Sequence, residues 1–231
     1  MRRVQVFDVN ETLLDLAALD PHFQRIFGDA GVRVAWFEQM IQSALVVTVT
    51  GVYHQFGSLA MAALEMTAER VGVELADDDK EAVAAQIRQL PAHPEVAGAL
   101  RRLRDAGLRL ASLTNSTEQV ARAQLEHAGL LDTFELVLSA DTVRRLKPAP
   151  EPYLLAAERL GVAVGEVRLI AAHAWDVAGA VRAGCATAFV ARPGRVLDPL
   201  VERPEIVGAN LAEVADAIVA VDSPASAPGP A

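Results

Sequence analysis

The sequence predicts an α/β fold with a Rossmann-like, doubly wound and mainly parallel sheet, and three observations predict it. A short apolar run over residues 4–7 ends at Asp8. From Leu108 onward, apolar runs of strand length alternate with stretches of helical periodicity. Between these two regions, residues 16–90 show helical periodicity and little strand signal. Strands and helices that alternate at this spacing are typical of βαβ units, in which helices cover both faces of a parallel sheet.

The predicted elements follow one another simply along the chain. Residues 4–7 form the first strand, although they lie far in sequence from the strands that they join. Further strands are expected over 108–113, 136–138, 167–171 and 187–190, separated by helices over 118–128, 151–160 and 176–183. The carboxyl ends of parallel strands meet at one edge of a sheet, and open α/β sheets bind their ligands there. Polar residues that follow these strands are therefore the first candidates for a functional site.

Residues 16–90 are predicted to form a helical cap domain inserted after the first strand. Apolar residues recur at helical spacing in two segments, which contain Trp36, Met40, Ala44 and Val47, and then Leu59, Ala63 and Met66. Two prolines within residues 91–94 mark the expected return to the core. The predicted domains are a core of residues 1–15 and 91–222, a cap of residues 16–90, and a disordered tail of residues 223–231, which has little apolar surface to bury.

Composition excludes several classes of partner. The chain has 231 residues, of which 52% are hydrophobic, enough for a well-buried core. Its formal net charge of −9 argues against nucleic acid and against anionic membranes, because no basic stripe is present. No apolar run reaches the length of a membrane span. The one cysteine, Cys185, cannot form an internal disulfide, which fits a cytoplasmic protein.

Four short motifs place polar residues at the predicted carboxyl edge of the sheet. They are Asp8-Val9-Asn10-Glu11-Thr12, Leu113-Thr114-Asn115-Ser116, Lys147-Pro148 followed by Tyr153, and Ala171-Ala172-His173-Ala174-Trp175-Asp176. Taken singly, an aspartate after a strand is commonly a helix cap, and Lys-Pro is a common loop dipeptide. Their order and spacing together resemble the haloacid dehalogenase superfamily over nearly the whole chain. The motifs are most similar to those of its L-2-haloacid dehalogenase branch.

Asp8 is the predicted nucleophile. A carboxylate that a rigid sheet aims at an electrophilic carbon, in a site without bulk water, can form an ester that water later cleaves. Lys147 would keep a partly buried Asp8 ionised. Thr12, Thr114 and Asn115 offer hydroxyl and amide donors near the strand ends, where a substrate carboxylate could bind. These three residues could also cap the helices that follow.

The resemblance implies further roles at the same edge. Asp176 would orient Lys147 or help to activate the water that hydrolyses the ester. Tyr153 matches a tyrosine that the branch uses near its site, and a tyrosine packed in the core is the alternative. His173 would stabilise a departing halide or relay a proton, and a buried, hydrogen-bonded histidine without chemistry is the alternative.

This chain departs from the pattern of the branch at the walls of the predicted pocket. Phe37 follows Trp36 where the branch usually has an arginine, so a hydrophobic edge replaces a charged donor. Asn10 and Glu11 stand where a tyrosine and a glycine are usual, and Glu11 is expected to face solvent or a helix N-terminus. His173 and the two alanines before it replace Ser-Ser-Asn.

Asn10 also separates two kinds of hydrolase. Phosphatases of the superfamily carry an aspartate two residues after the nucleophile, where it acts as the general acid, and the amide of Asn10 cannot do this. Asp8 and Asp176, with a lysine charge between them, make a poor site for a hard cation. The sequence therefore predicts no metal ligand and no cofactor.

The leading prediction is a metal-independent hydrolytic dehalogenase that releases halide from a small 2-haloalkanoic acid through an aspartyl ester. Its partners would be the halocarboxylate and the halide ion, and the branch often forms homodimers. Two alternatives stay open. The first is an atypical phosphatase or another hydrolase of the superfamily, and the second is a catalytically silent protein that binds a small anion or a protein partner. The fold alone does not choose among them.

Overall fold

The computed structural model describes residues 3–222, so the tail predicted over 223–231 lies outside the described residues. Within this range the strands form one sheet in the order β3-β2-β1-β4-β5-β6, and every neighbouring pair is parallel. The strands are β1 (Val4–Phe7), β2 (Leu110–Thr114), β3 (Leu136–Ser139), β4 (Val167–Ala171), β5 (Ala186–Val190) and β6 (Ile206–Gly208). The predicted doubly wound α/β fold is confirmed, and β6 is an additional strand that the sequence analysis did not predict.

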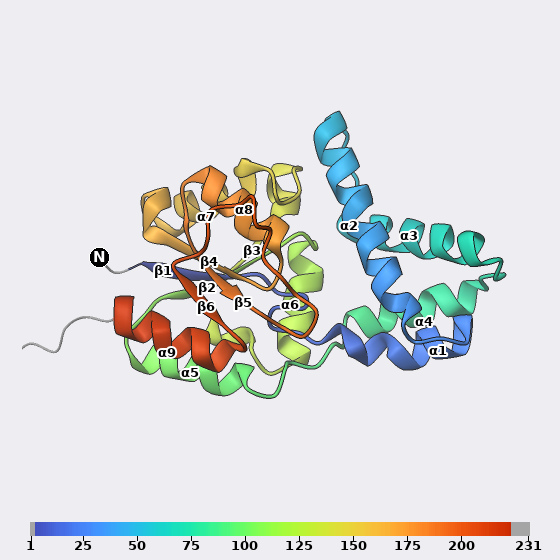
Figure 1. Cartoon of the computed structure of the whole chain (residues 1–231), viewed down its shortest axis with the longest axis horizontal. Helices are drawn as coiled ribbons and strands as arrows, with labels where there is room; N and C mark the ends of the chain where they lie inside the picture. Colours follow the sequence, from blue (N-terminus) through green and yellow to red (C-terminus); the bar gives the residue numbers. More distant parts are fainter. Residues whose placement is uncertain (1–2, 223–231) are drawn as a thin grey trace, which may run out of the picture.

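Helices cover both faces of this sheet (Figure 1). One face packs against α7 (Pro150–Leu160) and α8 (Ala174–Ala183), and the other against α5 (Val96–Asp105), α6 (Glu118–His127) and α9 (Leu211–Asp222). The side chains of β1 alternate between the two faces. Val4 and Val6 belong to the hydrophobic core on the side of α7 and α8, and Phe7 belongs to the core on the side of α5, α6 and α9. Both faces are buried, which explains why the strands read as near-continuous apolar runs.

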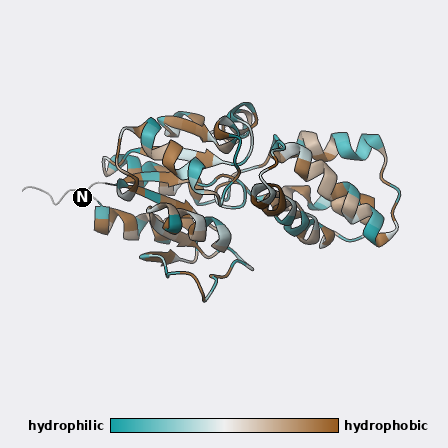
Figure 2. Cartoon of the chain, turned by 90° about the horizontal axis from the view of Figure 1, so that it is seen from above, coloured by the Kyte–Doolittle hydropathy of each residue, from teal (hydrophilic) through white to brown (hydrophobic). Residues whose placement is uncertain are grey.

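The helical insert follows β1 and lies to one side of the sheet (Figure 1). A short 3₁₀ helix (Leu16–Leu19) leads into α1 (Asp20–Phe27), α2 (Val32–Thr50), α3 (Phe56–Val71) and α4 (Asp77–Ile87). Figure 2 shows hydrophobic and hydrophilic stretches alternating along these helices, as expected when each helix buries one side. Trp36 packs against Phe23, with ring centroids 5.3 Å apart, and its Nε1 donates to the Ala60 carbonyl.

One residue of the predicted buried face of α3 is on the other side. Met66 is 43% exposed, whereas Thr67 is buried and its hydroxyl donates to the Ala63 carbonyl. Four residues after Ala63, the helix brings Thr67 rather than Met66 to the packed side.

The chain leaves for the insert and returns from it through adjacent segments. Leu14 and Ala92 form an antiparallel bridge, the Asp15 N–H donates to the Pro91 carbonyl, and the His93 N–H donates to the Leu13 carbonyl. These contacts lie at the predicted junctions, while the division into core and cap domains stays a prediction.

Helix α2 has 19 residues. Neither α2 nor any other helix within residues 3–222 combines the length and apolar character needed to cross a membrane.

Candidate active site

The sheet itself holds Asp8 in place. Asp8 directly follows β1, and its N–H donates to the Ile170 carbonyl of β4 at 3.0 Å, which continues the parallel ladder by one residue. The chain then turns sharply, because the Leu13 N–H donates back to the Val9 carbonyl. Glu11 lies in this turn with φ of 65°. Glycine adopts this left-handed conformation without strain, which accounts physically for the glycine usual here in the branch.

Lys147 joins the two acidic residues of the site. Its ammonium donates to Asp8 Oδ1 at 2.9 Å, to Asp176 Oδ2 at 2.6 Å and to the Leu113 carbonyl at 3.0 Å. All three N–H donors of the ammonium are therefore used. The Lys147 N–H also donates to Asn115 Oδ1 at 2.8 Å, so the amide of Asn115 holds the loop that carries the lysine.

Two hydroxyl groups hold the acidic residues from other directions. Thr12 Oγ1 donates to Asp8 Oδ2 at 2.7 Å and accepts from the Ala172 N–H at 2.9 Å. The Tyr153 hydroxyl donates to Asp176 Oδ1 at 2.6 Å. Each carboxylate is thus fixed through both of its oxygens, which restricts the direction in which Asp8 can react.

Electrostatics keep Asp8 ionised despite its burial. Burial alone would raise the pKa of Asp8, but the charge of Lys147 and the contacts with His173 and Thr12 outweigh it and hold this pKa well below its usual value. The two carboxylates raise the pKa of Lys147 against the opposing effect of burial, so the lysine stays protonated. Burial and the neighbouring Asp8 raise the pKa of Asp176. Two acids share one lysine, so the three charges sum to −1 when all are ionised.

Aromatic rings form one wall of the site. His173 stacks between Phe37 of α2 and Trp175 of α8, with ring centroids 5.4 Å and 5.2 Å apart. His173 Nδ1 lies 3.4 Å from Asp8 Oδ2. Phe37 therefore reaches the site from the insert and closes it with an apolar surface.

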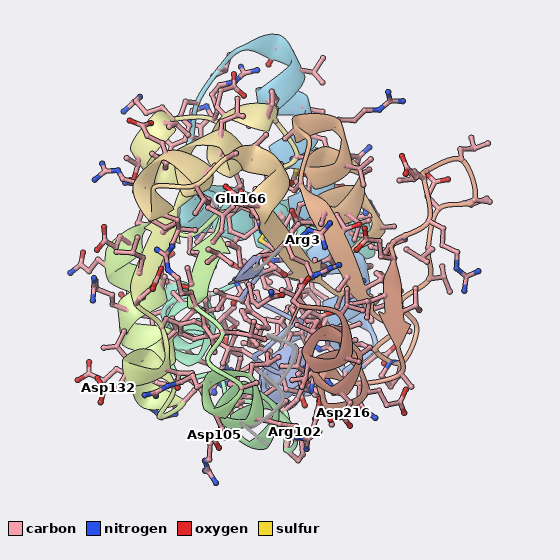
Figure 3. All side chains as sticks on the ribbon, turned by 90° about the vertical axis from the view of Figure 1, so that its left-hand side faces the viewer. Arg3, Arg102, Asp105, Asp132, Glu166 and Asp216 are labelled. Carbon is pink, nitrogen blue, oxygen red and sulfur yellow. The ribbon has the colours of Figure 1, made fainter. Side chains whose placement is uncertain are left out.

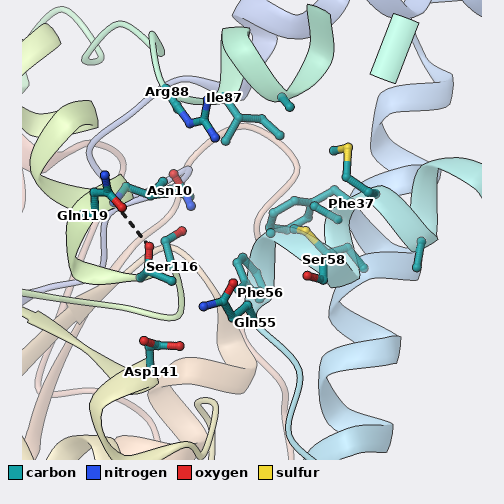
Figure 4. A pocket seen from close by; sticks show the side chains of 18 of the residues that line it. Asn10, Phe37, Gln55, Phe56, Ser58, Ile87, Arg88, Ser116, Gln119 and Asp141 are labelled. Carbon is teal, nitrogen blue, oxygen red and sulfur yellow. Dashed lines mark hydrogen bonds between the residues drawn. The ribbon is translucent and has the colours of Figure 1, made fainter. Parts of the chain in front are cut away.

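A small cavity of about 10 Å³ separates these groups. Most of the predicted site residues line it, and the lining consists of Asp8, Asn10, Phe37, Ile41, Phe56, Thr114, Asn115, Lys147, His173 and Trp175. This volume is about that of one water molecule, and Asp8 itself is 5% exposed, so little water reaches the carboxylate. Asn10, Phe37 and Phe56 also line a neighbouring cavity of about 910 Å³, into which Figure 4 shows these side chains pointing. The small space at Asp8 thus adjoins a much larger one between core and insert.

Three of the predicted binding residues make contacts within the protein. Asn10 Oδ1 accepts from Gln124 Nε2 at 3.1 Å, and Thr114 Oγ1 accepts from the Ser116 N–H at 3.2 Å. Asn115 bonds both the N–H and the carbonyl of Lys147. Their roles in binding a substrate stay predictions.

Of the two alternatives expected for Glu11, solvent is wrong. Its two carboxylate oxygens pair with Arg33, in the first turn of α2, at 3.5 Å, and with Arg195 of the loop after β5. The turn after β1 directs Glu11 towards the insert, where these arginines compensate its charge.

Sequence reasoning missed Arg195. Its guanidinium carbon lies 5.3 Å from the centroid of the Phe37 ring, beside the wall of the site. A signal was present, since the Arg-Pro-Gly-Arg segment ending at Arg195 follows β5 and must leave the sheet at the same edge as Asp8. Gly194, with φ of 78°, makes the turn that brings Arg195 back towards that edge.

Acidic, histidine and cysteine side chains do not gather in threes or more around a possible metal position within residues 3–222. Lys147 occupies the position between Asp8 and Asp176, and Asn10 contributes an amide that already accepts from Gln124. This donor set does not suit a hard divalent cation.

Comparison with known proteins places the chain in a family. Residues 3–184 match the family model of the haloacid dehalogenase-like hydrolases. Haloacetate dehalogenase H-2 of Moraxella sp. (strain B) is 27% identical, over 95% of this chain and 98% of its own length. (S)-2-haloacid dehalogenase 1 of Pseudomonas sp. (strain CBS-3) is 31% identical, over 82% of this chain and 85% of its own.

Solved structures agree with this assignment. The L-2-haloacid dehalogenase of Xanthobacter autotrophicus with covalently bound chloropropionic acid superposes with a TM-score of 0.88 and 26% identity, covering 96% of this chain and 99% of its own. The motifs, the fold and the family model lead to one conclusion, namely that the chain belongs to the haloacid dehalogenase-like hydrolase family.

Proposed function

We propose that the protein is a hydrolytic dehalogenase that removes halide from a small 2-haloalkanoic acid through an ester on Asp8. The observation that carries the proposal is the ionised Asp8 carboxylate, which is fixed by Lys147 and Thr12, is 5% exposed and lines a space of about 10 Å³. A fixed, poorly solvated carboxylate is suited to attack at carbon. The named activities of the relatives support the same reaction.

In the first step, a carboxylate oxygen of Asp8 forms a bond to C2 of the substrate. The bond between C2 and the halogen breaks, and the halide leaves with the electron pair. Lys147 keeps Asp8 ionised before the attack and afterwards faces the neutral ester together with Asp176. Backbone N–H groups at the strand ends, near Thr114 and Asn115, are suited to bind the substrate carboxylate.

In the second step, water adds to Cγ of the Asp8 ester. The bond between Cγ and the oxygen attached to C2 breaks, that oxygen takes one proton of the water to give the 2-hydroxy acid, the second proton leaves to solvent, and the Asp8 carboxylate is regenerated. Asp176 and His173 are the groups close enough to Asp8 to orient this water, through Lys147 and through the 3.4 Å contact respectively. Phosphoryl transfer is the weaker candidate, because Asn10 lacks the acid that a phosphatase needs there.

Halide release from chloro-, bromo- and fluoroacetate and from both 2-chloropropionate enantiomers, with EDTA present, tests the proposal. We expect metal-independent release, and we expect Asp8→Asn to lower it by about 10⁴-fold or more because the nucleophile is lost. Arg25→Gln on the exposed surface of α1 is the matched control and should keep the wild-type rate.

Oxygen labelling distinguishes the ester route from direct attack of water on the substrate. In ¹⁸O-water, many turnovers should introduce ¹⁸O into the Asp8 side chain, which mass spectrometry of the peptide detects. Turnover without label in Asp8 would contradict the ester. Hydrolysis of phosphate esters that requires Mg²⁺, with no halide release, would move the protein to the phosphatases.

The homodimer and the cytoplasmic location suggested above stay predictions. Sedimentation of the purified chain tests the first, and fractionation of the cells that contain it tests the second.

A further inference from the structure

A second cavity lies behind the aromatic wall of the site. It has a volume of about 360 Å³, and its lining includes Gln42 of α2, Ala174 of α8 and Arg195 of the loop after β5. It shares Phe37, His173 and Trp175 with the small space at Asp8. The space at Asp8 therefore shares lining residues with two larger cavities, one of about 910 Å³ and one of about 360 Å³.

His173 carries polar atoms in this shared wall that lack partners. The residue is 4% exposed, and neither ring nitrogen has a hydrogen-bond partner within the described part of the chain. The 3.4 Å distance from Nδ1 to Asp8 Oδ2 is longer than that of a well-formed hydrogen bond. A buried imidazole without partners costs free energy, so its position suggests a ligand that completes it.

The N-terminus of α8 opens at the same cavity. The helix has 10 residues, and His173, which precedes it, makes no side-chain cap. Ala174 and Trp175 begin the helix and line the cavity, and N–H groups of a first turn have no intrahelical acceptor. Together with the positive end of the helix dipole, these donors favour a negative charge.

Arg195 adds a full positive charge to this lining. Its guanidinium is next to the Phe37 ring, and its Nη2 donates to Glu11. No other side-chain N–H of Arg195 enters a hydrogen bond among the described residues, so several donors remain for a ligand. The proposed reaction calls for such a charge, because the negative charge of Asp8 passes to the halide as the ester forms, and Lys147 then pairs with Asp176 rather than with the halide.

We propose that Arg195 and the N-terminus of α8 form a binding site for a small monovalent anion, separated from Asp8 by the wall of Phe37, His173 and Trp175. The identity of the anion, though not the site itself, rests on the proposed function. That reaction supplies two, the released halide and the carboxylate of the 2-hydroxy acid. Arg195 of the core thus supplies a positive charge beside Phe37 of the insert, whose side chain has none.

Chloride binding to the complete protein, followed by the line width of ³⁵Cl NMR, tests the proposal without any substrate. Arg195→Gln should weaken the binding by about 10-fold to 100-fold, because it removes a charged hydrogen-bond donor. Arg195→Lys should restore part of it. Arg25→Gln, which removes the same charge from the exposed surface of α1, should leave it unchanged.

Glu11→Gln separates a binding role of Arg195 from a structural one. Glu11 competes with the anion for the guanidinium, so its neutralisation should tighten chloride binding by about threefold. If Arg195 only supported the fold, Glu11→Gln would weaken the site instead. Thermal unfolding of each variant confirms that the compared proteins are folded.

Competition identifies which anion uses the site. The wild-type protein should broaden the chloride line, and bound lactate would narrow it again by displacing chloride. If Arg195→Gln abolishes both the broadening and the narrowing, the site accepts either anion. If Arg195→Gln weakens lactate binding alone, the ligand is the carboxylate. Chloride and lactate binding that both persist unchanged in Arg195→Gln would overturn the proposal. Because no turnover is measured, a protein without dehalogenase activity could still bind chloride through Arg195, so the two proposals fail separately.

Discussion

The two ends of the strand pair β1 and β4 carry two buried charged clusters. Asp8, Lys147 and Asp176 form the Asp8 cluster beyond the carboxyl ends. Arg168 and Asp222 form the Arg168 cluster near the amino ends, with Arg168 Nε 2.9 Å from Asp222 Oδ2. Every side chain in the two charge pairs of Lys147 with Asp176 and Arg168 with Asp222 is at most 1% exposed. Burial and ion pairing alone therefore do not distinguish the two clusters.

Charge balance and surroundings do distinguish them. In the Arg168 cluster, Arg168 and Arg3 face Asp222 and Glu205, so positive and negative charges are equal in number. Figure 3 shows Arg3 on this side of the molecule, which faces away from the insert. The Asp8 cluster has two acids for one lysine and borders a cavity. The comparison teaches that an uncompensated charge beside a cavity, rather than a buried charge as such, indicates a functional site.

Replacing the cation of each cluster tests this difference most strongly. Lys147→Met and Arg168→Met each leave buried carboxylate without its main partner, which costs about 3–5 kcal/mol of unfolding free energy. Only Lys147→Met should also lower kcat/KM for halide release, by about 10³-fold, because only Lys147 contacts Asp8, the proposed nucleophile. Urea denaturation and the halide assay measure the two effects.

As the control for these two variants, kcat/KM is calculated per folded molecule. Both variants are assayed at a temperature where circular dichroism shows them folded. Equal losses of kcat/KM per folded molecule would contradict the assignment of function to the Asp8 cluster alone.

Asp222→Asn sharpens the comparison through its dependence on pH. Burial raises the pKa of Asp222, but hydrogen bonds and charges from Arg168, Gln5 and Arg3 outweigh it and lower this pKa below its usual value. The ionised carboxylate therefore stabilises the fold above about pH 4, and the contribution is lost as the pH falls through the lower folded-state pKa. Asp222→Asn should cost about 1.5–3 kcal/mol at pH 7 and progressively less below about pH 4. Urea unfolding at pH 7 and at pH 3 measures this, and a difference independent of pH would rule out the explanation.

Tyr153→Phe probes the Asp8 cluster without removing a charge. The variant loses the 2.6 Å bond to Asp176 Oδ1 and leaves that oxygen without its donor. We expect a loss of about 1–1.5 kcal/mol in unfolding free energy and a decrease of about tenfold in kcat, since Asp176 then holds Lys147 less rigidly. KM should change little, because Tyr153 is not among the residues that line the cavity at Asp8. A raised KM with unchanged kcat would instead place Tyr153 in contact with the substrate.

Residues that follow strand ends were predictable from the sequence. Asp8, Asn115 and Asp176 come after apolar runs, and parallel strands bring their carboxyl ends to one edge whatever the distance along the chain. The alternation of strands and helices likewise predicted the sheet. The local pattern of apolar residues was sufficient to predict both the sheet and the residues at its carboxyl edge, because the same pattern marks each strand and the point where it ends.

Contacts between segments that share no periodicity were not predictable. Arg168 reads as a surface residue of a strand, yet it is fully buried because Asp222, 54 residues later, pairs with it. Arg195 is an ordinary loop arginine until the turn at Gly194 brings it to Phe37. The strand β6 has three residues, too few for an apolar pattern to indicate it.

Cys185 should give the smallest effect, and it tests how far the influence of the Asp8 cluster extends. The thiol is 8% exposed, and burial together with the charge of Asp176 raises its pKa to about 12. At pH 8 only about one thiol in 10⁴ is then ionised, and the thiolate is the form that alkylates. Iodoacetamide should therefore leave both the mass and the activity of the protein unchanged, and Cys185→Ala should cost about 1 kcal/mol with normal kcat. Rapid alkylation with loss of activity would mean that α8 opens readily and that Asp176 is held less firmly than its contacts with Lys147 and Tyr153 require.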